Sequence, residues 1–247
     1  MVTFSNMLNI RTLSTSSKSV PAAVLLLLVV IFAGCSSDEP PLVPVATPVT
    51  AAEAVDLSRA AMSALESFSF QLTHESGHTT LSGSLQLTRA GGLVATNGLD
   101  LEAEANIGRA FVRVEAVVIG EQTWMTNPLT GVWSEIAPED SPFSFLDPVK
   151  LVADILGDTE QATYRTGGDS GSDLIVAGTI PAESLAALVG SVDANAVPNV
   201  VLTLDPSNKR LKKIVISGLV QPEDESDTIR VITLSEFDEP VSLEPPI

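Results

Sequence analysis

Cysteine, histidine and basic side chains are scarce in this 247-residue chain, and each shortage excludes a class of protein. Cys35 is the only cysteine, so the chain can form neither an internal disulfide nor a cysteine-rich metal site. Only two histidines are present, which leaves few residues that could act as a catalytic base. Lysine and arginine number 13 against 31 acidic residues, a formal net charge of −18. Because phosphate binding draws on clustered basic side chains, this balance argues against a nucleic-acid partner.

Long apolar segments are also rare, and the only one covers residues 22–33 and leads into Gly34 and Cys35. Residues 1–34 contain two basic residues and no acidic ones, which is the pattern of a secretory signal. The 12 apolar residues fall short of the roughly 20 that cross a bilayer as a helix. Small residues before a cysteine resemble a bacterial lipobox, in which the thiol receives a diacylglyceryl group and the signal is cut just before it. We therefore predict a signal peptide over residues 1–34 and lipidation at Cys35, although Phe32 stands where leucine is usual. The alternative is an ordinary buried cysteine that follows a transmembrane helix.

Removal of the signal would leave 213 residues with 11 basic and 31 acidic side chains, a net charge of −20. This charge argues against electrostatic docking on anionic lipid head groups, so the membrane would be reached through the Cys35 anchor or through apolar surface. Residues 35–50 carry four prolines and no hydrophobic periodicity, which predicts a semi-rigid tether after the anchor. Residues 51–247 are long enough to fold as one domain without a disulfide. The predicted location is the extracytoplasmic face of the cell membrane.

The domain is predicted to be α+β, beginning with a helix and continuing as a meander of antiparallel strands. Thr50 and Glu53 match a capping box for a helix over residues 51–66. Alternating apolar and polar residues then predict half-buried strands, with Gly91-Gly92 as a turn and residues 127–131 as a hairpin loop. The apolar face of the helix would consist of Ala54, Leu57, Ala61, Ala64 and Leu65, and the strands would cover residues 68–73, 81–88, 99–104, 110–119, 122–126 and 132–136.

The alternation stops at Pro138, and helices mix with strands in the second half of the chain. Asp147 and Pro148 have the residue types of an N-cap and a first helical position. Helices are predicted at residues 149–156 and 181–189, and strands at residues 173–179, 199–205, 211–220 and 228–237.

The sequence contains little that resembles a catalytic or metal site. Residues 168–171 read GDSG, as around the nucleophile of chymotrypsin-like proteases, but no histidine is placed to act as its base, and the composition is that of a turn. His74 and His78 have a spacing that suits a metal only on a helix, so we interpret them as solvated. Residues 223–227 lack the alternating oxygen ligands and fixed glycine of a calcium loop and are interpreted as a solvated charge run. No catalytic residue, metal or cofactor is therefore predicted.

Apolar side chains recur on one face of the predicted strands and on the helices that would cover them. A plain sheet-on-helix core would have this pattern, but two features favour a cavity: aromatic residues make up only 4% of the chain, and Gly83 and Ala103 occupy inward positions. The candidate pocket residues are Phe68, Phe70, Leu72, Leu81, Leu85, Leu87, Val112, Val114 and Val118 on strands and Val152, Ile155, Leu156, Leu185 and Leu188 on helices.

Several short sequence pieces occur together in a recognisable order behind the cysteine. They are Thr123-Trp124 with Gly131-Val132-Trp133, Phe145-Leu146-Asp147-Pro148, residues 176–182, residues 200–205, and residues 232–237 before Pro240-Val241. In this order and spacing the chain resembles the LppX/LprG-type lipoproteins, which share a half-barrel fold with the LolA/LolB lipoprotein carriers.

The resemblance implies a strongly curved antiparallel half-barrel, with helices packed across its concave face and an apolar pocket between them. It also implies that the chain binds and carries lipids or glycolipids in the cell envelope and has no catalytic residues. Because burial of methylenes makes long acyl chains bind tightly, we expect release to need a conformational opening or a partner that takes the lipid, such as a lipid exporter or acceptor protein. Phe143 and Phe145, in a proline-flanked segment, are the candidate lip of the pocket. Two other classes stay open: an anchored structural or signalling module with a filled core, and an anchored hydrolase that would depend on Ser170.

Overall fold

The computed structural model describes residues 49–81, 85–166 and 172–247, in which twelve strands form a single antiparallel sheet. The sheet is not closed: β7 and β8 are its two edges, and β1 joins its two halves by pairing with β3 on one side and β12 on the other. The order across the sheet is β7-β6-β5-β4-β3-β1-β12-β11-β10-β9-β8, with β2 paired to β3 outside this path. The strands are β1 (Phe68–Ser76), β2 (Thr79–Leu81), β3 (Leu85–Ala95), β4 (Gly98–Ile107), β5 (Ala110–Ile119), β6 (Gln122–Thr126), β7 (Trp133–Ile136), β8 (Glu160–Arg165), β9 (Leu174–Thr179), β10 (Asn199–Leu204), β11 (Leu211–Ser217) and β12 (Ile229–Ser235).

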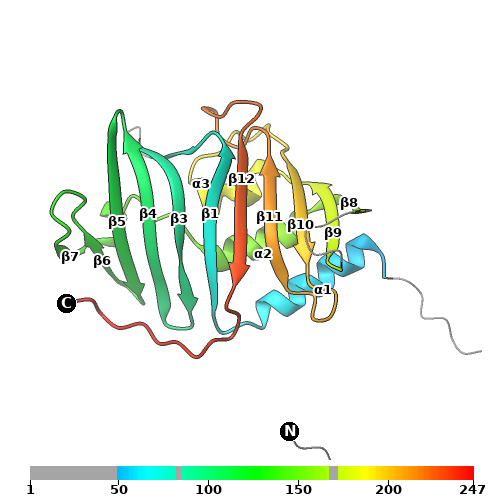
Figure 1. Cartoon of the computed structure of the whole chain (residues 1–247), viewed down its shortest axis with the longest axis horizontal. Helices are drawn as coiled ribbons and strands as arrows, with labels where there is room; N and C mark the ends of the chain where they lie inside the picture. Colours follow the sequence, from blue (N-terminus) through cyan, green and yellow to red (C-terminus); the bar gives the residue numbers. More distant parts are fainter. Residues whose placement is uncertain (1–48, 82–84, 167–171) are drawn as a thin grey trace, which may run out of the picture. The chain divides into compact units, whose positions relative to one another are not determined.

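The helices cover one face of this sheet, which makes the molecule the predicted α+β half-barrel (Figure 1). They are α1 (Ala51–Ser63), α2 (Pro148–Asp158) and α3 (Ala186–Val189), together with the 3-10 turns η2 (Pro138–Asp140) and η3 (Ala182–Leu185). Helix α2 packs against α1, η3 and α3, and together with α3 it faces β1, β3 and β12 behind the middle of the sheet (Figure 1). The inward side chains of strands such as β1, where Phe68, Phe70 and Leu72 are buried, form one core with these helices.

The predicted starts of α1 and α2 are confirmed, because capping depends on residues only three positions apart. The Thr50 side chain accepts a hydrogen bond from the Glu53 amide at 3.2 Å, and the Glu53 carboxylate accepts one from the Thr50 amide at 2.8 Å. Asp147 caps α2 by accepting from the Lys150 amide at 2.9 Å. The predicted face of α1 is wrong in part: the buried residues include Val55, Ser58 and Met62, whereas Leu57 is 46% exposed.

Several boundaries differ from the sequence prediction. The predicted helix over residues 181–189 is the 3-10 turn η3 followed by the short helix α3, and the first helix ends at Ser63 rather than at residue 66. Gly91 and Gly92 do not form a turn but lie inside β3, opposite Gln71 and Phe70 of β1. A methyl group added at Gly92 would lie 1.9 Å from the Asp100 carbonyl oxygen, so glycine permits a close approach of β3 to β4 rather than a reversal of the chain. The predicted strand over residues 81–88 is a β2–β3 hairpin, in which Leu81 pairs with Leu85. Strand β8 was not predicted, because most of its residues are exposed at the sheet edge and show no alternation.

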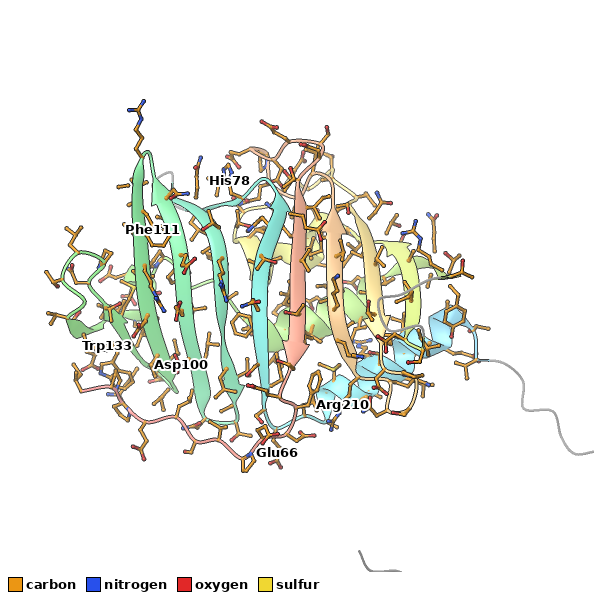
Figure 2. The ribbon with its side chains drawn as sticks, viewed as in Figure 1. Glu66, His78, Asp100, Phe111, Trp133 and Arg210 are labelled. Atoms are coloured by element: carbon orange, nitrogen blue, oxygen red, sulfur yellow. The ribbon has the colours of Figure 1, made fainter. Side chains whose placement is uncertain are left out.

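The segment that follows β12 is tied to the start of the chain and then runs along the end of the sheet (Figure 1). Asp238 accepts a hydrogen bond from the Glu66 amide at 3.1 Å and forms an ion pair with Arg210, near which Glu66 also lies (Figure 2). Farther along, the Asn97 side chain at the β3–β4 turn donates to the Leu243 carbonyl at 2.9 Å and accepts from its amide at 3.2 Å. These contacts fix the C-terminal segment beside the β3–β4 turn.

A buried polar network closes one end of the core and overturns the interpretation of residues 223–227 as fully solvated. Arg230 on β12 is 0% exposed and donates to both carboxylate oxygens of Asp224, at 2.6 and 2.8 Å. Burial opposes ionisation of Asp224, but the hydrogen bonds from Arg230 and from the amides of Gln221 and Val220 outweigh it and lower the pKa of the carboxyl group. The Gln221 side chain links this pair to β2 and α3, because it donates to the carbonyls of Thr80 and Val189.

His74 belongs to the same network, so its interpretation as a solvated residue is also wrong. Its Nε2 lies 3.0 Å from Thr79 Oγ1, which accepts a hydrogen bond from Arg230 Nε, and its Nδ1 lies 3.0 Å from the Thr88 carbonyl. The Thr88 carbonyl can only accept, so Nδ1 carries the proton and the Thr79 hydroxyl donates to Nε2. Burial lowers the pKa of His74, and the nearby Arg230 charge acts in the same direction.

We expect this histidine to make the fold sensitive to acid. Above pH 6.5, the ordinary pKa, the imidazole is largely neutral in both states and its contribution to stability is fully present. As the pH falls below 6.5 and through the lower pKa of the folded state, the unfolded chain binds a proton first and the free energy of unfolding decreases. Urea unfolding of wild type and His74→Gln between pH 7.5 and 5 should show a smaller loss of stability in the variant. Equal losses would contradict this role of His74.

Candidate functional site

A small apolar cavity of about 20 Å³ lies between the sheet and the helices. Its sheet side is formed by inward residues of β1, β3 and β12, and its other side by α2, α3 and the segment before α2. A cavity of this size holds about one water molecule, so the space between sheet and helices is almost filled by side chains. The lining consists of Phe70, Leu72, Leu87, Ala90, Phe143, Phe145, Leu146, Pro148, Leu151, Val152, Leu188, Ile232 and Leu234.

A much larger groove of about 770 Å³ lies beside this cavity, over the ends of β3, β4 and β5. Its floor is apolar and is formed by side chains such as Leu99, Leu101 and Val118. Its opposite wall is the segment from Pro138 to Val149, whose polar lining residues are Glu139, Ser141, Ser144 and Asp147. The remaining lining residues are Val94, Ala95, Thr96, Asn97, Gly98, Ala116, Gly120, Thr123, Phe143, Leu146 and Pro148.

Phe143, Leu146 and Pro148 line both the groove and the small cavity, so the segment that carries them is the partition between the two. The partition is ordered by short-range hydrogen bonds: the Phe143 amide donates to Ser141 Oγ at 3.2 Å, and the Leu146 amide to the Phe143 carbonyl at 2.9 Å. It is joined to α3 by a single backbone hydrogen bond, from the Asp147 amide to the Ala187 carbonyl at 3.2 Å.

A further hollow of about 400 Å³ lies on the other side of the partition, toward α3. Phe145 lines it and packs beside Gly190, where a methyl group would lie 3.1 Å from the ring. Gly190 also has a positive φ of 76°, a conformation that glycine adopts readily. Phe143 and Phe145 therefore belong to a partition that separates three spaces. These are the groove of about 770 Å³, the hollow of about 400 Å³ and the small apolar cavity between sheet and helices.

The structure brings together about half of the residues predicted to form the pocket. Phe70, Leu72, Leu87, Val152 and Leu188 line the small cavity with both predicted lip residues, and Val118 lines the groove. The other eight line neither space: Phe68, Leu81, Ile155, Leu156 and Leu185 are buried in the core, and Leu85, Val112 and Val114 are half-buried on their strands. Ala103 faces inward and is buried, whereas Gly83 lies outside the described residues.

The sequence prediction missed most of the groove. Leu99 and Leu101 alternate with acidic residues and were expected to face inward, yet nothing in the sequence distinguishes them from ordinary core residues. The groove exists because the described helices leave the ends of β3, β4 and β5 uncovered, and α2 reaches the groove only through Pro148 and Val149. The sequence alone does not show this placement. The one local signal is the proline-flanked segment 138–148, which supplies the opposite wall.

Comparison with known families decides what kind of protein has this arrangement. The profile of the LppX_LprAFG lipoprotein family matches residues 50–243, which is most of the chain. This protein belongs to the LppX_LprAFG lipoprotein family. The family predicted from the sequence is thereby confirmed. Comparison with curated protein sequences gives no match.

Solved structures of LppX_LprAFG lipoproteins have the same fold. LprF from Mycobacterium bovis is 17% identical, with a TM-score of 0.60 over 79% of this chain and 96% of that chain. LppX from Mycobacterium tuberculosis is 19% identical, with a TM-score of 0.55 over 78% of this chain and 98% of that chain. A LolA superfamily protein from Nitrosomonas europaea matches 79% of this chain and 96% of its own at 13% identity and a TM-score of 0.27.

Several sequence predictions concern segments that the structure does not describe. The signal, Cys35 and residues 36–48 of the tether lie outside the described residues, as does Ser170 of the GDSG segment. Within the described part of the chain, no group of three or more histidine, cysteine or acidic side chains is arranged to hold a metal. Also within those residues, none of the helices has both the length and the apolar character to cross a bilayer.

Proposed function

We propose that this protein is a membrane-anchored lipid carrier, which binds the acyl chains of a lipid or glycolipid in the groove on the extracytoplasmic side of the cell membrane. The observation that supports this most is the groove of about 770 Å³ with its apolar floor. Its volume falls in the range of about 300–1,000 Å³ that is usual for small-molecule sites. Removal of alkyl chains from water would drive binding, at about 0.8 kcal/mol for each buried methylene.

Movement of the partition would open a route from the groove to the space between sheet and helices. Phe143 and Leu146 contact both spaces, and their movement away from β1 would join the groove to the buried cavity. In the described arrangement, the side chains of Phe143 and Leu146 occupy the place where a deeper acyl chain would lie. Release would require the same movement, which a partner such as a lipid exporter or acceptor could favour.

The anchor at Cys35 would hold the carrier at its source of lipid. Two acyl chains anchor a protein firmly, whereas one chain gives only marginal binding. The proline-rich residues 35–50 would then let the domain reach lipid above the bilayer surface.

A second candidate function is an anchored structural or signalling module. It is favoured by the small size of the buried cavity, about 20 Å³, which is what a filled core without a ligand would have. Native mass spectrometry of the purified protein after incubation with vesicles separates the two functions. Bound lipid is expected for the carrier, and a mass without lipid under all conditions would leave the module as the better explanation.

Occlusion of the groove should strongly reduce lipid uptake without unfolding the protein. Val118 lines the groove from β5, and Val118→Trp would place an indole in the space where an acyl chain is proposed to lie. We expect at least about a tenfold loss of vesicle-to-protein lipid transfer, because two or more methylenes would lose their burial at about 0.8 kcal/mol each.

The matched control is Ile119→Trp, since Ile119 is the next residue of β5 and points to the opposite face of the sheet. This variant should take up lipid as the wild type does. Equal loss in both variants would indicate damage to the strand, and unchanged uptake by Val118→Trp would place the ligand elsewhere.

A further inference from the structure

The charged residues that line the groove are both acidic. Glu139 of η2 and Asp147, the cap of α2, are exposed and stand where the wall of the groove meets solvent. Among the residues described as lining the groove, no lysine, arginine or histidine accompanies them. Any charged part of a ligand at this opening would therefore meet negative groups first.

The surroundings of the opening strengthen this negative field. Acidic residues directly follow lining positions at Glu121 and Asp140. Glu244 follows Leu243, whose backbone is bonded to Asn97 at the groove. The basic residue next to the lining, Lys150, is paired with Asp154 one turn along α2. Basic side chains thus offer no obvious partner for an anionic group at the opening.

The rest of the opening carries uncharged hydrogen-bonding groups. Thr96, Ser141 and Ser144 supply hydroxyl groups, and Asn97 supplies an amide that is bonded to the backbone of Leu243. Hydroxyl groups both donate and accept, and carboxylates accept from ligand hydroxyl groups. This combination suits an uncharged, hydroxyl-bearing head group and opposes a phosphate.

Resting on the proposed lipid-carrier function, we propose that Glu139 and Asp147 set the head-group specificity of the groove, so that it admits lipids with uncharged head groups and rejects anionic phospholipids. The two carboxylates act by repulsion across a partly solvated opening. Repulsion of this kind is strong at low ionic strength and declines as salt screens the charges.

The test compares two lipids with the same acyl chains, phosphatidylglycerol and a monoglycosyl diacylglycerol. Each is presented at the same mole fraction in phosphatidylcholine vesicles, and the lipid bound to the protein is counted by native mass spectrometry. The wild type should prefer the uncharged glycolipid by about tenfold at low salt, as expected for two charges at several ångströms in a largely aqueous medium. High salt should reduce this preference.

The decisive variant is Glu139→Gln/Asp147→Asn, which removes both charges while asparagine keeps a side chain suited to capping α2. The ratio of glycolipid to phosphatidylglycerol should fall to about twofold, since only the distant charges of the chain remain. The control is Asp56→Asn/Glu75→Gln, which makes the same change in net charge at exposed positions that line none of the described hollows. Its ratio should equal that of the wild type.

The outcomes separate this inference from the proposed function. Uptake of both lipids by the wild type in equal amounts would overturn the specificity and leave the carrier function intact. If the ratio of glycolipid to phosphatidylglycerol falls equally in the control variant, the preference comes from net charge. That result would also overturn the proposed role of Glu139 and Asp147. If neither lipid binds, the carrier function fails and the specificity falls with it.

Discussion

Replacement of Arg230 by methionine should destabilise the fold by about 3–5 kcal/mol, because it leaves the Asp224 carboxylate buried without its partner charge. The guanidinium is 0% exposed and also bonds Thr79, Gln221 and the His78 carbonyl, so its loss removes the centre of the network. Urea unfolding monitored by circular dichroism at neutral pH measures the change. A shift in midpoint at constant slope would show that the loss is one of stability.

The surface pair of Arg113 and Glu102 provides the control. Their nitrogen and oxygen lie 2.6 Å apart, as close as in the buried pair, but the side chains are 54% and 44% exposed. Arg113→Met should leave the urea midpoint nearly unchanged, since water solvates the charge that remains. The double variant Arg230→Met/Asp224→Asn should recover part of the loss of Arg230→Met, because no unpaired charge is then buried. If Arg230→Met costs no more than Arg113→Met, the network does not hold this end of the core.

The parts of the fold that could be predicted from the sequence are those set by interactions between nearby residues. The caps at Thr50 and Asp147 depend on residues three positions away, and the inward face of β1 follows from the alternation of Phe68, Phe70 and Leu72. These interactions are local, so the sequence contains the whole of each signal. The α+β class and the antiparallel meander follow from the same local patterns.

The network of Arg230 could not be predicted in this way, because its members come from separate parts of the chain. Thr79 and Arg230 are hydrogen-bonded although they lie 151 positions apart. Arg230 in turn pairs with Asp224, whose side chain is 3% exposed and which the sequence shows only as a member of an acidic run. The alternation within β3 likewise indicates a strand, but only the approach of Asp100 from β4 explains why Gly92 is glycine. Tertiary placement, rather than residue type, assigns these roles.

In the candidate site, too, the features set by nearby residues could be predicted and those set by tertiary contacts could not. The apolar face of the sheet and the proline-flanked segment could each be predicted from the sequence. The position of that segment as a partition between the groove and the small cavity could not. Phe143 illustrates this: the sequence places it in a loop, whereas the structure buries it to 7% exposure between β1 and α2. Its burial changes what a substitution there should do.

Removal of the Phe143 side chain should destabilise the ligand-free protein and at the same time make room for a ligand. Phe143→Ala deletes a buried ring and enlarges the cavity of about 20 Å³, at an expected cost of about 3–5 kcal/mol in the free energy of unfolding. The cost falls toward the lower value if the partition collapses into the space. An apolar cavity made in this way stays dry and binds apolar molecules, so lipid should restore much of the lost stability.

The measurement is thermal unfolding of wild type and variant with and without lipid vesicles. A ligand that binds only the folded state raises stability according to its affinity, and the variant should therefore gain more from lipid than the wild type does. Phe111→Ala is the control, since Phe111 is 62% exposed near the β4–β5 turn (Figure 2) and lines none of the described hollows. This variant should differ little from wild type under either condition. If lipid stabilises Phe143→Ala no more than it stabilises the wild type, the space beneath the partition is a structural core rather than the inner end of a lipid site.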